Sequence, residues 1–309
     1  MPVPPAKPAK TGKMATITVG VNTTDRTTLR SKLRDYYALT KPEVNLLILM
    51  TTSAGYYLAA RGPLRIAGLL NTLLGTLLVA SGTATLNQWM ERVWDGLMRR
   101  TASRPLPAGR VSAREAFCFG TLLSVAGGLY LALAVNRLSA LLAISTLLSY
   151  LWIYTPLKRK TPLCTLLGAI PGAMPTLIGW AGAAGTIDRQ ACLLFGILFL
   201  WQFPHFLAIA LIYREDYARA GYRMLPRFDL DSRFTRAEIF TCTLLLVGVT
   251  LVATRSSGGA AAMGLAGAFM LYPVSRLLRS TAPRLASRVV HASVLYLPVV
   301  LAVMMVAKP

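Results

Sequence analysis

Apolar residues recur along this chain in long uninterrupted runs. We place these runs near residues 42–61, 66–90, 113–135, 138–156, 163–184, 190–213, 236–254, 258–277 and 288–307. A helix needs about 20 residues to cross the hydrocarbon core of a bilayer. The runs lack the alternation of barrel strands, and in lipid only helices and closed barrels satisfy their own backbone hydrogen bonds. The pattern predicts an all-α polytopic membrane protein with nine transmembrane helices.

The start of the chain has a different character. Residues 1–28 are rich in proline, lysine and threonine, which predicts a flexible N-terminal tail. Residues 29–41 alternate apolar and basic side chains at helical spacing, which predicts a short interfacial helix with its leucines and tyrosines on the membrane. We therefore expect a tail, this interfacial helix, and a transmembrane domain over residues 42–309.

Charge sets the expected orientation. The chain has 33 Lys and Arg against 12 Asp and Glu, for a net charge of +21, which in a soluble protein would suggest nucleic acid. With 54% hydrophobic residues we expect anionic lipid headgroups as partners and no nucleic acid. Most cations lie in the loops after the second, fourth, sixth and eighth runs. Those loops and the N-terminus are predicted to be cytoplasmic, with the C-terminus across the membrane.

The same loops would face the matrix in an organelle. The tail does not match an Arg-rich, acid-free transit peptide, which favours a bacterial inner membrane and a periplasmic C-terminus.

Three polar residues near the end of the second run form the first candidate site. Asn87, Glu91 and Asp95 are spaced four residues apart, so a helix places them on one face. Two neighbouring carboxylates need a positive charge between them, and Mg²⁺ takes carboxylates together with phosphate oxygens. Arginines follow at once and suit the same phosphates. The pattern predicts half of a Mg²⁺–diphosphate site at a membrane face.

A second interpretation of this stretch remains open at this point. The acids could belong to a solvated helix end and pair with Arg92, Arg99 and Arg100. Acidic residues are scarce in this chain, however, and ionisable residues at membrane depth are costly and usually functional.

A similar pattern follows the sixth run. Trp201 and His205 lie within it, and Glu215, Asp216 and Tyr217 follow at its basic end. The two motif runs are four spans apart, which suggests two four-helix halves facing one cavity. His205 could ligate haem iron, orient an acceptor, or make a hydrogen bond that packs helices.

Four blocks together resemble the intramembrane prenyltransferases of the UbiA superfamily. They cover residues 39–42, 87–106, 154–162 and 201–226. The Asn-x3-Glu-x3-Asp pattern of the second block marks the superfamily. In the fourth block, Trp-Gln-x-Pro-His-Phe and Asp-Tyr-x2-Ala-Gly are similar to the haem-modifying branch. The resemblance implies a helical bundle around a central cavity.

The resemblance also implies roles for individual residues. Mg²⁺ would be held by Asn87, Glu91, Asp95 and Asp216, with Glu215 as a weaker candidate. Arg104 and Lys158 would act on the diphosphate. Further substrate-binding residues would be Lys41, Arg100, Arg159, Tyr154, Trp201, His205 and Tyr217. Arg100 could instead pair with an acid.

The implied reaction is the transfer of a farnesyl group from farnesyl diphosphate to the 2-vinyl group of protohaem IX, with addition of water. Breaking the allylic C–O bond leaves a diphosphate anion, which metals and cations stabilise, and a carbocation, which aromatic faces hold without bonding to it. The implied cofactor is Mg²⁺, haem is a substrate, and haem A synthase is a candidate partner. An aromatic prenyltransferase of quinone or chlorophyll synthesis and a membrane transporter are the alternatives.

Overall fold

The computed structural model describes residues 29–254, 257–280 and 282–308, and the predicted tail lies outside the described residues. This part of the chain is built from helices joined by loops. The elements are α1 (Leu29–Leu39), α2 (Pro42–Ala59), α3 (Ile66–Asp95), α4 (Ala113–Ala134), α5 (Arg137–Leu148), the π-helix η1 (Ser149–Tyr154), α6 (Thr155–Leu157), α7 (Cys164–Ala184), α8 (Arg189–Ile212), α9 (Arg214–Arg219), α10 (Leu225–Phe228), α11 (Arg233–Ala253), α12 (Ser257–Arg279) and α13 (Pro283–Val306).

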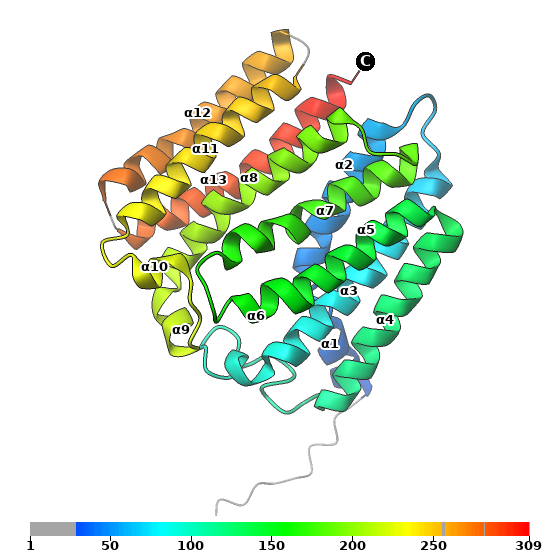
Figure 1. The fold of residues 1–309 in the computed structure, drawn as a ribbon, viewed down its shortest axis with the longest axis vertical. Coiled ribbons are helices and arrows are strands. Elements are labelled where there is room, and N and C mark those ends of the chain that lie inside the picture. The colour runs from blue at the N-terminus through cyan, green and yellow to red at the C-terminus, as the bar shows by residue number, and fades with distance from the viewer. Residues whose placement is uncertain (1–28, 255–256, 281, 309) are drawn as a thin grey trace, which may run out of the picture.

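Within the described residues, eight helical segments are long and apolar enough to cross a membrane. They are α3, α4, the continuous segment from α5 to α6, α7, α8, α11, α12 and α13. The predicted count of nine is not confirmed, because α2, the first predicted span, is not among them. Its 18 residues include Glu43, Asn45 and several threonines and tyrosines, which lower its hydropathy. It nevertheless packs inside the bundle against α7 and α3 (Figure 1).

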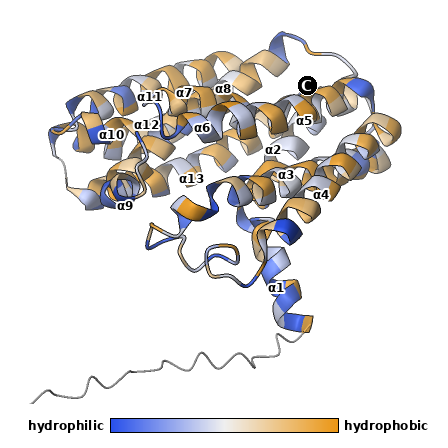
Figure 2. Ribbon diagram, turned by 60° about the horizontal axis from the view of Figure 1, so that its bottom comes forward, coloured by the Kyte–Doolittle hydropathy of each residue, from blue (hydrophilic) through white to orange (hydrophobic). Residues whose placement is uncertain are grey.

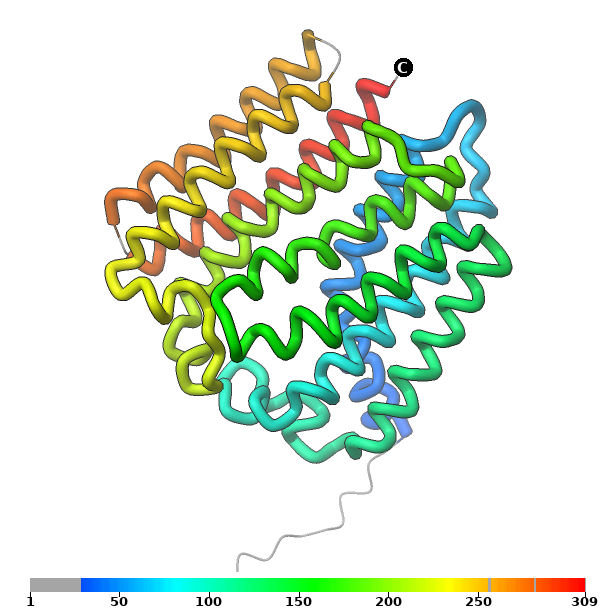
Figure 3. The backbone as a smooth tube through the Cα atoms, in the orientation of Figure 1, coloured from blue at the N-terminus to red at the C-terminus, as the bar shows by residue number. Residues whose placement is uncertain are grey.

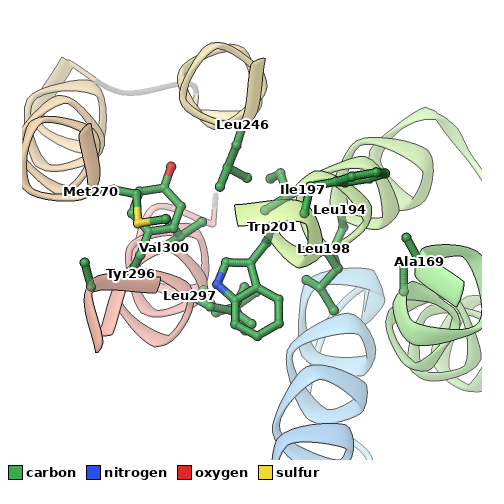
Figure 4. Packing of buried hydrophobic residues seen from close by; sticks show 14 of the residues in the cluster. Ala169, Leu194, Ile197, Leu198, Trp201, Leu246, Met270, Tyr296, Leu297 and Val300 are labelled. Carbon is green, nitrogen blue, oxygen red and sulfur yellow. The ribbon is translucent and has the colours of Figure 1, made fainter. Parts of the chain in front are cut away.

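The long helices pack side by side in two groups. One group contains α3, α4, α5 and α7, and the other contains α8, α11, α12 and α13 (Figure 1). The second group, with α2 and α7, encloses a buried apolar cluster, in which Trp201 of α8 points toward Leu297 of α13 (Figure 4). Lipid tails are as apolar as these side chains, so close packing rather than hydrophobic transfer stabilises the contact.

Glycines bring α2 and α7 into backbone contact. A Cβ atom at Gly55 would lie 2.3 Å from the carbonyl oxygen of Thr176, and one at Gly179 would lie 2.0 Å from that of Thr52. Any side chain at either position would separate the two helices. This contact holds α2, and with it the residues just before α2, close to the rest of the bundle.

Polar residues gather at one end of the bundle. Figure 2 shows hydrophilic residues on α1 and α9 and in the adjoining loops, whereas the long helices are largely hydrophobic. Two ion pairs attach α1 to this end: Arg110 Nε to Asp35 Oδ1 at 2.9 Å, and Lys32 Nζ to Glu115 Oε1 at 3.0 Å. Glu115 also completes a capping box with Ser112 that starts α4. The membrane-surface position predicted for α1 stays a prediction.

The segment from α5 to α6 reaches the same end. Figure 3 shows it as one continuous rod that ends beside the loop after α3. Its last full turn widens into η1, and the backbone N–H of Thr155 bonds the carbonyl of Tyr150 five residues earlier. Such π-type turns often mark functional sites. This one brings Tyr154 and Thr155 next to α3.

Candidate active site

Helix α3 carries the first candidate cluster. Asn87, Glu91 and Asp95 are 1%, 5% and 1% exposed, and α3 continues to Asp95, beyond the predicted end of the run. Asn87 donates from Nδ2 to Glu91 Oε2 at 3.0 Å and to Thr155 Oγ1 at 3.1 Å. Because one helical face holds all three side chains, their oxygen atoms lie together in a buried environment.

Each carboxylate of this cluster has a cationic partner from a loop. Lys158 Nζ lies 3.0 Å and 3.1 Å from the two oxygens of Glu91, and Arg104 donates to Asp95 Oδ2 at 2.7 Å. Among the described residues, no ion pair joins these acids to Arg92, Arg99 or Arg100. Arg92 instead donates to the carbonyl of Trp89. Buried carboxylates require such compensation, because an unpaired buried charge is strongly destabilising.

Lys41 is a third cation at the cluster. It precedes α2 and donates from Nζ to Asn87 Oδ1 at 3.0 Å. Burial, together with the positive charges of Arg104 and Lys158, lowers the pKa of Lys41 to about 7. The three basic groups outnumber the two carboxylates. A bound anion would therefore reduce the repulsion among them.

Tyr222 and Thr155 belong to the cluster although sequence reasoning missed them. Tyr222 is 2% exposed and its hydroxyl lies beside the Glu91 carboxylate. Burial, and then the Glu91 carboxylate, raise the pKa of Tyr222, so it stays a neutral donor. Its loop is fixed by the N–H of Arg223, which donates to the carbonyl of Lys158 at 2.7 Å. The glycine at position 221 was the sequence feature that could have indicated a turn just before Tyr222. In the structure Gly221 has a φ of 75° and forms that turn.

The second acidic motif is arranged differently. Asp216 pairs with Arg219 on its own short helix, and Glu215 is exposed. Across the described residues, no hydrogen bond or ion pair joins Asp216 to the α3 cluster, and no group of three His, Cys, Asp or Glu side chains is placed to hold a metal. The structure therefore brings Tyr222, rather than Asp216, into contact with Glu91.

The aromatic candidates divide between two places. Lys158 Nζ lies 4.5 Å from the centre of the Tyr154 ring, so Tyr154 is part of the site. Trp201 and His205 lie where α8 packs on α13: Trp201 Nε1 donates to the Ser293 carbonyl at 2.7 Å, and His205 Nδ1 is 2.8 Å from Ser293 Oγ. His205 thus makes the helix-packing hydrogen bond that was one of its three interpretations.

The remaining predicted binding residues lie around the α3 end. Arg159 stacks 3.6 Å from the Trp94 ring centre, and Arg100 lies 5.4 Å from that of Tyr213. Tyr217 packs with Trp94 and Tyr222. These contacts join the loops after α3, α6 and α8 into one surface at the end of the bundle where the polar residues gather, which we call the basic end.

The donor set suits a hard divalent cation. Two carboxylates and a carboxamide on one face of α3 supply oxygen ligands, and Mg²⁺ usually takes one or two carboxylates with phosphate oxygens and water. Lys41, Arg104 and Lys158 supply donors for an anion beside it. The arrangement can bind a metal-associated polyanion and stabilise an anionic leaving group.

Comparison with known proteins gives consistent similarities. Residues 48–297 match the UbiA prenyltransferase family. The chain is 47% identical over 290 residues to protoheme IX farnesyltransferase of Solibacter usitatus (strain Ellin6076), covering 90% of this chain and 99% of the relative.

Two solved structures share the fold. One concerns digeranylgeranylglyceryl phosphate synthase, with a TM-score of 0.73, 19% identity, and coverage of 90% of this chain and 98% of that one. The other is a UbiA homolog from Archaeoglobus fulgidus bound to GPP and Mg²⁺, with a TM-score of 0.62, 14% identity, and coverage of 87% and 99%.

Proposed function

The chain belongs to the UbiA prenyltransferase family, and on that premise we propose that it farnesylates protohaem IX. The substrates are farnesyl diphosphate, protohaem IX and water, and the products are haem O and diphosphate. The relative that is 47% identical and matched over 99% of its length is a protoheme IX farnesyltransferase, which supports the choice of acceptor. Haem is a substrate here and not a cofactor.

The observation that carries the proposal is the buried cluster on α3. Its carboxylates are paired with Lys158 and Arg104, two loop cations that a diphosphate would attract. When these cations turn to the phosphate oxygens, Glu91 and Asp95 are released for a metal. The site then exchanges one set of charge pairs for another, and no buried charge is left unpaired.

We assign Mg²⁺ as the cofactor, held by Asn87, Glu91, Asp95 and Asp216. Bound there, Mg²⁺ supplies positive charge to the departing diphosphate. For Asp216 to join, its side chain would leave Arg219. The fold relative from Archaeoglobus fulgidus, bound to GPP and Mg²⁺, supports a metal on a prenyl diphosphate.

The chain's own cations do much of the remaining work. Lys41, Arg104 and Lys158 donate to the diphosphate oxygens and stabilise the charge that develops as the allylic C–O bond breaks. The ring of Tyr154, already 4.5 Å from Lys158 Nζ, offers a face that holds the farnesyl cation without trapping it covalently. Arg100 and Arg159 lie at the edge of the site and bind the phosphate group that is farther from the farnesyl chain.

The acceptor binds on the side of α8. His205 uses Nδ1 for Ser293 and stacks on Trp201 at 4.7 Å, so Nε2 is the atom that would face haem. Tyr217 contributes a flat surface for the macrocycle, and Trp201, which is buried and stacks on His205, orients that imidazole. The vinyl carbon attacks the farnesyl cation, water adds to the carbocation that forms next to the ring, and the added water releases a proton to the departed diphosphate.

We place the protein in a bacterial inner membrane, with the basic end of the bundle and the N-terminus in the cytoplasm and the C-terminus in the periplasm. The support is the concentration of Lys and Arg in the loops at that end. Lipid surrounds the bundle, and haem A synthase is the proposed downstream partner.

The proposal is tested with purified full-length protein, protohaem, farnesyl diphosphate and Mg²⁺. Mass spectrometry should detect haem carrying a hydroxyethylfarnesyl group. Farnesylation of a benzoquinone precursor in place of haem would overturn the acceptor and favour an aromatic prenyltransferase. Absence of any prenyl transfer with either acceptor would overturn the proposal that the protein is a prenyltransferase.

A further inference from the structure

We propose that Gln88 and Asn45 are positioning residues that hold the α1–α2 junction on α3 and thereby aim the ammonium group of Lys41 at the diphosphate site. Neither residue belongs to the Asn-x3-Glu-x3-Asp pattern or to any predicted site. The inference rests on the proposed function, because it concerns how Lys41 is presented to a prenyl diphosphate.

The first observation is the backbone of Lys41. Its φ of 52° and ψ of 65° lie in the left-handed region, which a side-chain-bearing residue rarely adopts. Within the described residues, Ser232 is the one other non-glycine residue with positive φ. Such strain persists when the surroundings over-determine it, and it concentrates at functional sites. Something must therefore hold the junction in this shape.

Gln88 supplies one of the restraints. Its side chain is 1% exposed and donates from Nε2 to the carbonyl of Leu39 at 2.7 Å. Leu39 is itself fully buried at the end of α1. Gln88 directly follows Asn87, which accepts from Lys41 Nζ at 3.0 Å. Adjacent residues of α3 thus hold the backbone just before Lys41 and the far end of its side chain.

Asn45 supplies the second restraint from the other side of Lys41. Its Nδ2 donates to the carbonyl of Thr40 at 2.9 Å and to Ser81 Oγ at 2.9 Å. Within the described structure its Oδ1 is buried without a hydrogen-bond partner. A buried acceptor without a partner is unfavourable. We infer that the two hydrogen bonds that Nδ2 donates outweigh this cost.

Together the two amides pin the carbonyls of residues 39 and 40, the two peptide units that precede Lys41. A lysine side chain is long and flexible, and ordering it on binding would weaken affinity for an anion. With the backbone fixed, the ammonium is already in place before the ligand arrives. Loss of either amide should therefore weaken binding through Lys41 and through no other residue.

The test measures binding of farnesyl diphosphate with Mg²⁺, in the absence of haem, by calorimetry on the purified full-length protein. Lys41→Met and Gln88→Met should each weaken binding about tenfold, and the double variant should be less than about twofold weaker than Lys41→Met alone. If the fold-losses in binding of the two single variants multiplied in the double variant, the two residues would act independently and the proposal would be overturned. A folded Gln88→Met protein that binds like wild type would also overturn it.

Gln202→Met is the matched control. Gln202 is also a buried glutamine that donates to a backbone carbonyl of another helix, Ala169 at 2.8 Å. Its effect on binding should multiply with that of Lys41→Met. Should Gln88→Met fail to fold, Asn45→Leu has a similar volume, removes the Nδ2 donor without burying a charge, and enters the same cycle with the same two outcomes.

This experiment separates the inference from the proposed function. If haem is not farnesylated but the coupling between Gln88 and Lys41 is found, the acceptor is wrong and the positioning role stands. If haem is farnesylated and the effects multiply, the function stands and the positioning role falls. A wild-type protein that binds no farnesyl diphosphate would overturn both.

Discussion

The two acidic motifs of this protein look alike in sequence and behave differently in the fold. On α3, Glu91 and Asp95 are buried and paired with cations from two different loops. After α8, Glu215 is exposed and Asp216 pairs within its own short helix. An apolar run followed by acids and then arginines therefore does not by itself predict which acids are buried and paired with cations from other loops.

The difference has a local cause. Helix α3 runs unbroken to Asp95, so four-residue spacing keeps its polar residues on one face. Helix α8 ends at Ile212, and Tyr213, with φ of −103° and ψ of 26°, separates it from α9. The acids of the second motif therefore start a new helix. What the second motif contributes to Glu91 is Tyr222, beyond the turn at Gly221.

Removing the metal tests both motifs at once and should have the largest effect. Chelation with EDTA should reduce haem farnesylation by at least about a thousandfold, because the diphosphate would leave without the main source of positive charge. Rates are measured by mass spectrometry of the product, and added Mg²⁺ should restore them. Full activity in EDTA would contradict a metal at either motif.

Asp95→Asn attacks the first motif alone. We expect a loss of about a hundredfold or more in the rate of farnesyl transfer, since the variant removes a buried carboxylate and leaves Arg104 without its partner. Glu238→Gln on α11 is the matched control, because it removes a half-buried carboxylate outside the site and should leave the rate unchanged. Equal losses in the two variants would indicate a general effect of charge.

Asp216→Asn makes the corresponding change in the second motif and sharpens the comparison. Because Asp216 pairs with Arg219 and does not contact α3, we expect a smaller loss, about tenfold, carried by weaker metal binding. Titration of the rate with Mg²⁺ should show a higher requirement for the metal. A loss as large as that of Asp95→Asn would mean that the two motifs act as equals in the working enzyme.

Tyr222→Phe should have the smallest effect. It removes the hydroxyl beside Glu91, which keeps its bonds to Lys158 and Asn87, so we expect a loss of about threefold in kcat/KM. Tyr217→Phe on the preceding helix α9 is the comparison, because it removes a hydroxyl and keeps the ring that packs against Tyr222. If Tyr217→Phe lowers the rate more than Tyr222→Phe, the loop acts through the acceptor rather than through Glu91.

The sequence predicts the architecture well where composition decides it. Long apolar runs in a lipid environment must be helical, and these helices form the expected bundle. The count of nine depended on α2, in which Asn45, Thr51 and Thr52 are buried within the bundle. Asn45, for example, bonds Ser81 of α3. Hydropathy alone does not reveal which polar residues in a span have partners.

The candidate site divides in the same way. Spacing within one helix predicted a shared face for Asn87, Glu91 and Asp95, and α3 supplies it. No spacing rule connects Thr155 to Asn87 or Tyr222 to Glu91, because those residues are far apart in the chain and belong to different elements. Sequence patterns describe neighbours along one element, whereas partners across elements depend on packing.

By itself the sequence determined an all-helical membrane protein with a polar face on α3 and a basic end, because bilayer thickness, helical periodicity and charge act locally on the chain. The tertiary structure decided which cations neutralise that face, where the second motif lies, and how Lys41 is held in a left-handed conformation. Those outcomes depend on where loops far apart in the chain come to rest when the helices pack, and on which buried charges and carbonyls then need partners.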